Sequence, residues 1–201
     1  MTRASIATTL LVLVAVAAAC SPDRSSRPPP GASPLPSPSP SAVASVPASN
    51  AAGVVVDAAL LEVLPATVDG VPIIESADGE AEALSDPNLG EVALAIAAGL
   101  AIDSSSGEFV YAVVVRLRDG AMSDERFRDW RDSFDEGACS QARGVAGNAE
   151  AEIAGRTVHI GSCVGGVLTY HVWLREPGLL VSASAVGDRR LGQRLVEGLR
   201  P

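Results

Sequence analysis

The residues that decide the fold are Phe109–Leu117, with the sequence FVYAVVVRL. Valine and aromatic residues favour extended backbone, and here they occupy both alternating sets of positions. A strand that is apolar on both faces is typical of the middle of a sheet that is covered from two sides. The stretch therefore predicts a central strand.

The residues after this strand predict one helix. Ser123 can accept a hydrogen bond at its N-terminus, and Asp124 lies in the first turn, where a negative charge is favoured. Phe127, Trp130 and Phe134 then recur with helical spacing and form one apolar stripe. Arginine and aspartate alternate on the remaining surface, which we interpret as a solvent-facing side rather than a binding site.

From residue 150 onward the sequence predicts antiparallel strands, because short β-prone runs are separated by glycine-containing turns. The expected strands are Glu150–Ala154, Thr157–Cys163, Val167–Arg175 and Leu179–Ala185, followed by a last helix that begins at Asp188.

The part of the chain before the central strand is less regular. Asp57 can cap a short helix through Ala58–Leu64, and Val71–Ile74 is expected to be a short strand. We interpret Asp78–Leu89 as an acidic loop. The alanine-rich run Glu91–Ala101 is expected to be a helix, since alanine has the best helix propensity.

Together these elements predict a single α+β domain over residues 54–201, an antiparallel-dominated sheet of five or six strands with about four helices packed on it. In element order alone this outline is similar to small exported α+β lipoprotein domains, including the PsbP/Mog1-like type. That similarity implies no function, and no family residue is carried over.

The N-terminus has the pattern of an export signal. Arg3 is followed by an apolar stretch over Ile6–Ala19, too short to span a bilayer comfortably. The stretch ends in Ala17-Ala18-Ala19-Cys20, which resembles the lipobox of bacterial lipoproteins. The resemblance implies that residues 1–19 are a signal peptide and that Cys20 receives a lipid. Ala17 replaces the usual leucine, and the three alanines also fit ordinary signal peptidase, so free secretion stays open.

Residues 20–53 are rich in proline, serine and alanine, and residues 1–53 hold nine of the fourteen prolines. Such a segment cannot bury enough apolar area to offset its ordering entropy, so we expect a disordered tether. In polyproline conformation it would reach roughly 100 Å. The predicted product is an extracytoplasmic domain tethered to the cell membrane.

Cys139 and Cys163 are the two remaining cysteines. In an oxidising compartment two cysteines of one domain usually pair, so we predict a disulfide between them, with two free thiols as the alternative.

The charge distribution limits the possible partners. Residues 51–115 contain eleven acidic residues and no basic one, whereas residues 116–201 contain twelve of each. An acidic domain repels phosphate backbones, which argues against a nucleic-acid partner. All fifteen basic residues are arginine, so chemistry that needs a lysine, such as a Schiff base, is excluded.

The two histidines lie on consecutive predicted strands. A two-residue turn at Gly165-Gly166 would place His159 and His171 on opposite faces of the sheet, whereas a three-residue loop would place them directly opposite each other. Only the second case would allow a two-histidine metal site, and it would need a third ligand.

Two other patterns have weak functional interpretations. Glu75, Asp78, Glu80 and Glu82 suit calcium by ligand type, but their spacing is not that of an EF-hand, so a solvated loop is favoured. The run Gly161–Gly165, GSCVG, has the form of a nucleophile elbow, yet a strand follows it instead of a helix.

No catalytic residue, cofactor or metal is therefore nominated. The leading hypothesis is a non-enzymatic cell-envelope lipoprotein, a binding or interaction module for an envelope protein or a small molecule. The alternatives are an exported hydrolase or metal-binding protein that uses the His159/His171 region, and a structural envelope component.

Overall fold

A computed structural model of the chain describes residues 53–200. The predicted signal peptide (1–19), Cys20 and residues 20–52 of the predicted tether lie outside the described residues. Between residues 53 and 200, no helix combines the length and the apolar character needed to cross a membrane.

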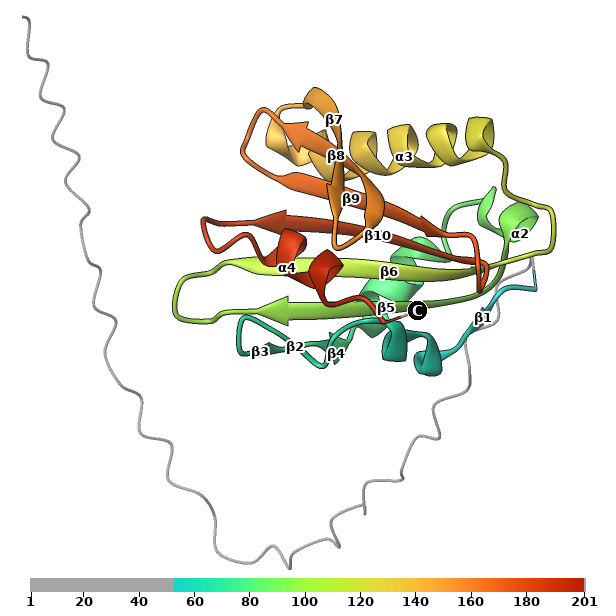
Figure 1. Cartoon of the computed structure of the whole chain (residues 1–201), viewed down its shortest axis with the longest axis horizontal. Helices are drawn as coiled ribbons and strands as arrows, with labels where there is room; N and C mark the ends of the chain where they lie inside the picture. The colour runs from blue at the N-terminus through green and yellow to red at the C-terminus, as the bar shows by residue number, and fades with distance from the viewer. Residues whose placement is uncertain (1–52, 201) are drawn as a thin grey trace, which may run out of the picture. The chain divides into compact units, whose positions relative to one another are not determined.

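The described part contains strands and helices in the order shown in Figure 1. The strands are β1 Val55–Val56, β2 Thr67–Val68, β3 Val71–Pro72, β4 Ile74–Glu75, β5 Ala93–Ile102, β6 Phe109–Leu117, β7 Val145–Ile153, β8 Arg156–Cys163, β9 Leu168–Leu174 and β10 Leu179–Val186. The α-helices are α1 Ala77–Ala83, α2 Leu89–Val92, α3 Asp124–Cys139 and α4 Leu191–Glu197, and two 3-10 helices are η1 Ala58–Val63 and η2 Ser140–Ala142.

Eight of the strands form one sheet in the order β1-β5-β6-β10-β9-β8-β7, with β4 also pairing with β5. The α+β class is confirmed, but the sheet is larger than the expected five or six strands and it is mixed. Strand β1 runs parallel to β5, whereas the other neighbours in the sheet run antiparallel. The two-residue strands β1 and β4, which both pair with β5, are too short to leave a periodic sequence pattern.

Strand β6 has the predicted bounds and the predicted central position between β5 and β10. Its valines alternate between two separate cores. Val110 and Val114 belong to the core on one face of the sheet, and Val113 and Val115 belong to the core on the other. This alternation explains why the run is apolar at every position but Arg116.

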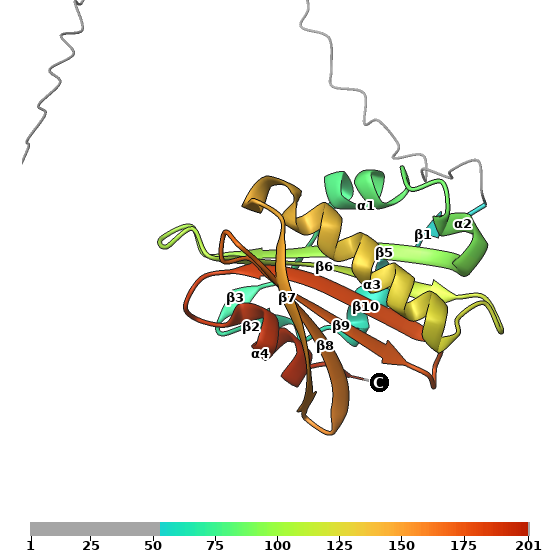
Figure 2. The same cartoon turned by 90° about the horizontal axis from the view of Figure 1, so that it is seen from above.

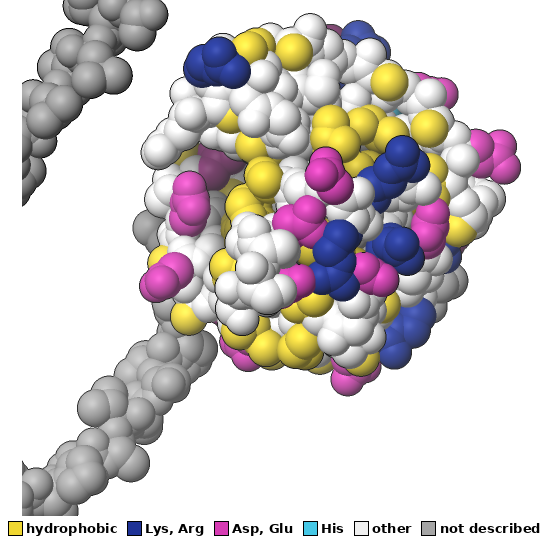
Figure 3. All heavy atoms as spheres, turned by 90° about the vertical axis from the view of Figure 1, so that its left-hand side faces the viewer, with side chains coloured by type: hydrophobic (Ala, Val, Ile, Leu, Met, Phe, Trp, Pro, Cys, Tyr) yellow, Lys and Arg dark blue, Asp and Glu magenta, His cyan; other side chains and the backbone are white. Residues whose placement is uncertain are grey.

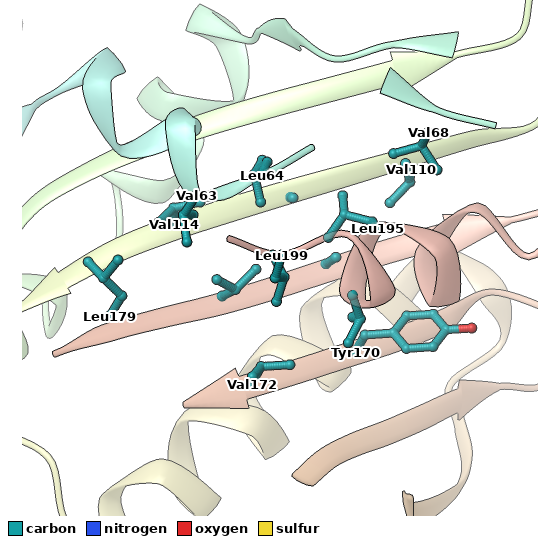
Figure 4. Close-up of a cluster of buried hydrophobic side chains, with 14 of the residues drawn as sticks. Val63, Leu64, Val68, Val110, Val114, Tyr170, Val172, Leu179, Leu195 and Leu199 are labelled. Carbon is teal, nitrogen blue, oxygen red and sulfur yellow. The ribbon is translucent and has the colours of Figure 1, made fainter. Parts of the chain in front are cut away.

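Helices cover both faces of the sheet (Figure 2). One core lies between the sheet and the helices η1 and α4, and the close-up in Figure 4 labels Val63, Leu195 and Leu199 together with the strand residues Val114 and Tyr170 of this core. The second core lies between the sheet and α1, α2 and α3. The result is a three-layer arrangement with the sheet in the middle.

Two expectations for the first part of the domain are wrong. The alanine-rich run is strand β5 rather than a helix, because it is paired on both edges, with β6 on one side and with β1 and β4 on the other. Tertiary pairing here overrides helix propensity. The acidic stretch is not all loop, since it contains α1, whose N-terminus is capped by Ser76 accepting from the Gly79 N–H at 3.3 Å.

Several other expectations hold. Asp57 caps a short helix, η1, by accepting from the Ala59 N–H at 3.1 Å. Ser123 caps α3 by accepting from the Arg126 N–H at 3.2 Å. The four C-terminal strands are present, although β7 begins earlier, at Val145, and the last helix begins later, at Leu191.

Arg189 joins three chain segments that are far apart in the sequence. Its guanidinium donates to Asp69 at 2.7 Å, binds Asp103, and lies 4.0 Å from Glu108. Figure 3 faces this end of the domain and shows arginine and acidic side chains intermingled on the surface. Hydrogen bonds from Ser105, followed in size by the charge of Arg189, lower the pKa of Asp103 to about 2.

The sulfur atoms of Cys139 and Cys163 lie 1.98 Å apart, which is consistent with the predicted disulfide. Cys139 is the last residue of α3 and Cys163 the last of β8, and both are buried. The pair therefore ties the C-terminal end of α3 to the sheet.

We predict that the double substitution Cys139→Ala/Cys163→Ala lowers the free energy of unfolding by about 3 kcal/mol, because a closed loop of this length restricts the unfolded chain. Urea denaturation followed by circular dichroism measures the change. Wild-type protein treated with a reductant should show a similar loss. Equal midpoints for oxidised protein, reduced protein and the variant would contradict the prediction.

Candidate functional site

A cleft of about 610 Å³ lies on the α3 side of the sheet. One wall is α3, the other is the α1–α2 segment, and the floor is formed by β6 and β10. Figure 2 shows these helices on the same side of the sheet. The size is within the range of small-molecule pockets in proteins, which is about 300–1,000 Å³.

The inside of the cleft is apolar and aromatic. Leu89 and Val113 are buried there, and the rings of Tyr111, Trp130 and Phe134 are half-buried along its surface. The predicted stripe on α3 therefore has two roles. Phe127 is buried in the core, whereas Trp130 and Phe134 each turn part of the side chain toward the cleft.

The rim of the cleft is mainly acidic. Glu82, Asp86 and Glu91 belong to the α1–α2 wall, and Asp129 belongs to α3. The one basic residue in the lining, Arg126, donates from Nη1 to the backbone carbonyl of Ala121 at 2.7 Å. In the part of the chain that the structure describes, none of the four acidic side chains forms an ion pair.

The Tyr111 ring is held from behind, since its hydroxyl donates to the carbonyl oxygen of Gly79 at 3.1 Å. Burial, followed by the charges of Glu82 and Glu80, raises the pKa of Tyr111 to about 12. The phenol therefore stays protonated and keeps donating at any physiological pH.

Trp130 is held by a chain of buried polar groups. Its indole N–H donates to Ser182 Oγ at 2.9 Å, and the Ser182 hydroxyl lies 3.0 Å from His171 Nδ1. His171 Nε2 lies 2.9 Å from Asp135 Oδ1. A carboxylate only accepts, so Nε2 carries a proton; in the neutral imidazole Nδ1 then accepts from the Ser182 hydroxyl.

Asp135 is the end of this chain and is 4% exposed. It also accepts from the Thr169 hydroxyl at 2.5 Å, and Thr169 Oγ1 accepts from the Gly161 N–H at 3.1 Å. Burial acts to raise the pKa of Asp135, but the hydrogen bonds from His171 and Thr169 outweigh it and hold the pKa below its ordinary value. Gly161 is required here, because a Cβ at this position would lie 2.3 Å from Asp135 Oδ2.

Ser182, His171 and Asp135 are the residue types of a hydrolytic triad, but their arrangement differs from one. In serine hydrolases Nδ1 faces the acid and Nε2 faces the serine, and here the two nitrogens are exchanged. Ser182 and His171 are each 1% exposed, and the Trp130 indole N–H is bonded to the serine oxygen. A substrate carbonyl cannot reach this oxygen, so the three residues act as buried support for α3.

Of the two alternatives for the hairpin between the histidines, the structure has the three-residue loop. His159 is directly opposite His171, and the Cys163 N–H donates to the Val167 carbonyl at 2.8 Å, which closes the hairpin. However, both His171 nitrogens face protein groups. Arg131 Nη1 lies 2.6 Å from His159 Nδ1. Over residues 53–200, no three His, Cys, Asp or Glu side chains converge in a way that would hold a metal ion.

The acidic cluster is divided between different environments. Glu80 is buried and accepts from the Ala98 N–H at 3.3 Å, and burial raises its pKa. Asp78 is exposed in the first turn of α1, and Glu82 lies on the cleft rim. Only Glu82 among these residues therefore belongs to the candidate site.

The Arg/Asp alternation on α3 is not entirely solvent-facing, which corrects the sequence-based interpretation. Asp135 is buried, and Arg131 faces His159 rather than water.

No protein-family model, no curated protein and no solved structure matches this chain. The structure thus defines an α+β domain with an aromatic cleft on one face of its sheet.

We predict that Asp135→Asn lowers the free energy of unfolding by about 2 kcal/mol at neutral pH, because it removes a buried charge to which two side chains donate. Folding lowers the pKa of Asp135, so its ionised carboxylate contributes fully to the free energy of unfolding above the unfolded-state pKa of about 4. This contribution is lost as the pH falls through the lower pKa of the folded state. The difference from wild type should therefore narrow below about pH 4.

Urea titrations of both proteins at several pH values measure this difference. Asp132→Asn is the matched control, since Asp132 is exposed on the same helix, and it should change stability by less than about 0.5 kcal/mol. If the difference in free energy of unfolding between wild type and Asp135→Asn stayed constant down to about pH 3, Asp135 would not be the stabilising buried carboxylate.

Proposed function

We propose that this protein is a non-enzymatic binding protein of the cell envelope, which holds an apolar small molecule in the cleft between α3 and the α1–α2 segment. The observation that carries the proposal is the cleft of about 610 Å³ with three aromatic rings in its lining. A concave, mainly apolar pocket with a few polar groups is the usual form of a small-molecule site.

The support behind the cleft favours binding. Trp130 is bonded to Ser182, and Tyr111 is bonded to Gly79, so both rings keep their positions without a ligand. The ordering of these side chains takes place during folding and does not have to be repeated on association. The Cys139–Cys163 pair also fixes one end of the α3 wall.

Within residues 53–200, the one serine that is hydrogen-bonded to a histidine is buried, which favours binding over hydrolysis. The serine closest to a histidine, Ser182, is covered by the indole that forms part of the cleft wall. The cleft therefore presents ring surfaces and valine and leucine side chains to a guest, and no reacting group of the triad type.

The cellular location is part of the same proposal. A lipid on Cys20 and a linker over residues 21–53 would hold the cleft near the outer surface of the cell membrane, where apolar molecules partition. Such a location suits a protein that receives an apolar guest from a membrane or from another envelope protein.

Gly137 provides a direct test of the cleft. It lies on the α3 wall, and no atom lies within 4 Å of where its Cβ would be. We expect Gly137→Phe to fill the cleft and to weaken binding of decanol, a neutral probe, by about tenfold or more. The helix itself should not suffer, because glycine has a lower helix propensity than phenylalanine.

The measurement is the emission of Trp130 in a Trp173→Phe background, in which it is the only tryptophan. Gly137→Ala is the matched control. It should bind decanol as the parent does and should be more stable by about 0.5–1 kcal/mol. Equal decanol affinity in the Phe and Ala variants would mean that the probe does not bind in the cleft.

For the anchor, we predict that the wild-type protein stays with the membrane fraction of a bacterium that processes lipoproteins, whereas Cys20→Ser is found in the soluble extracytoplasmic fraction. Intact mass of the wild type should correspond to a chain that begins at Cys20 and carries acyl chains. A mature protein with an unmodified Cys20 would disprove lipidation and favour free secretion.

A further inference from the structure

We propose that the ligand of the cleft is a cationic amphiphile, a molecule with an apolar alkyl or aromatic body and an ammonium group at the rim. This inference rests on the proposed function, because it concerns the chemistry of the molecule that the cleft binds. It is carried by the distribution of charge around the cleft together with the aromatic rings inside it.

The α1–α2 wall has no positive charge. Glu82, Asp86 and Glu91 line it, and residues 51–115 contain no lysine or arginine at all. On the opposite wall Asp129 adds a fourth carboxylate, and Arg126 is the one guanidinium. The lining therefore has a net charge of −3, from four acidic groups and one basic group.

Several acidic side chains elsewhere in the domain are paired with arginine. Asp69 and Asp103 are bound to Arg189, and Asp124 lies 2.6 Å from Arg175. Arginines were thus available to neutralise acidic groups, but none pairs with the acidic residues of the rim in the described part of the chain. An unneutralised rim around an apolar interior concentrates cations at the mouth.

The rings strengthen this preference. Ammonium groups are attracted to the faces of tryptophan, tyrosine and phenylalanine, and all three ring types line the cleft below the rim. A carboxylate head group would meet a rim of net negative charge and the negative ring faces, with the Arg126 guanidinium as the single favourable charge in the lining. The same geometry that accepts an amine therefore disfavours an anionic lipid or a fatty acid.

The test compares decylamine, decanol and decanoate, which share one alkyl chain and differ in head-group charge. Binding is followed by Trp130 emission in the Trp173→Phe protein, below the concentrations at which the probes form micelles. We expect affinity to fall in the order decylamine, decanol, decanoate, with about tenfold or more between the amine and the carboxylate at low salt. Raising the salt to about 0.5 M should bring the ratio of decylamine to decanoate affinity closer to one, because exposed charges are then screened.

A pair of variants locates the charge effect. Asp86→Asn/Glu91→Gln removes two rim carboxylates, and Asn at position 86 can still accept from the Asn88 N–H, as Asp86 does at 2.8 Å. It should lower the ratio of decylamine to decanol affinity by about threefold or more. Glu62→Gln/Glu152→Gln changes the net charge by the same amount at exposed positions outside the cleft lining, and it should leave that ratio unchanged.

The outcomes separate the two proposals. If decanol binds but decylamine binds no more tightly than decanoate, the charge inference is wrong and the apolar cleft stands. An equal effect of the two double variants would also overturn the inference, since the preference would then come from net charge and not from the rim. If none of the three probes binds, both proposals are wrong.

Discussion

The position of α3 depends on one buried carboxylate. Asp135 is 4% exposed, and an ionised group at that depth needs hydrogen-bond donors to offset the loss of its solvation. The donors are Thr169 and His171 on β9, and Gly161 on β8 supplies the space. Together with the apolar contacts of Phe127, these hydrogen bonds hold α3 in its place over the sheet. The chain continues through His171 and Ser182 to Trp130, so the same constraint orients a ring on the cleft wall.

The cleft follows from how the helices cover the sheet. Strand β6 is apolar on both faces, so each face needs a cover. On one face η1 and α4 supply it. On the other, α3 packs toward β8, β9 and β10, and α1 and α2 pack toward β5 and β6. The strip between these two groups has no helix above it, and Tyr111, Val113 and Ser184 form its floor. The α3 wall has no side chain at Gly137, and no atom lies within 4 Å of where its Cβ would be.

The sequence was sufficient for the elements whose pattern is local. Strand Phe109–Leu117, the cap at Ser123 and the four C-terminal strands are periodic or capped in ways that neighbouring residues determine. Strand β5 was missed because alanine is a helix former by local preference, and only pairing on both edges makes it a strand. Asp135 was interpreted as solvated, yet it lies eight residues after Phe127, on the apolar side of the helix. A carboxylate at a core position of the helix was the sequence feature that could have indicated its burial. No sequence feature indicated the cleft, since it arises between segments distant in the sequence.

The unequal charge of the two parts of the domain acquires a meaning in three dimensions. The first part supplies eleven acidic residues and no base, and the second part is balanced. Arg189 and Arg194 neutralise two acidic residues of the first part, Asp69 and Asp103. Neither of these residues lines the cleft. The α1–α2 wall therefore keeps its negative charge, and it faces rings whose surfaces are also negative. Solubility alone would be served by carboxylates anywhere on the surface. Their position around an apolar opening adds a field that acts on whatever enters, and a positive charge on an apolar molecule is the feature that such a field favours.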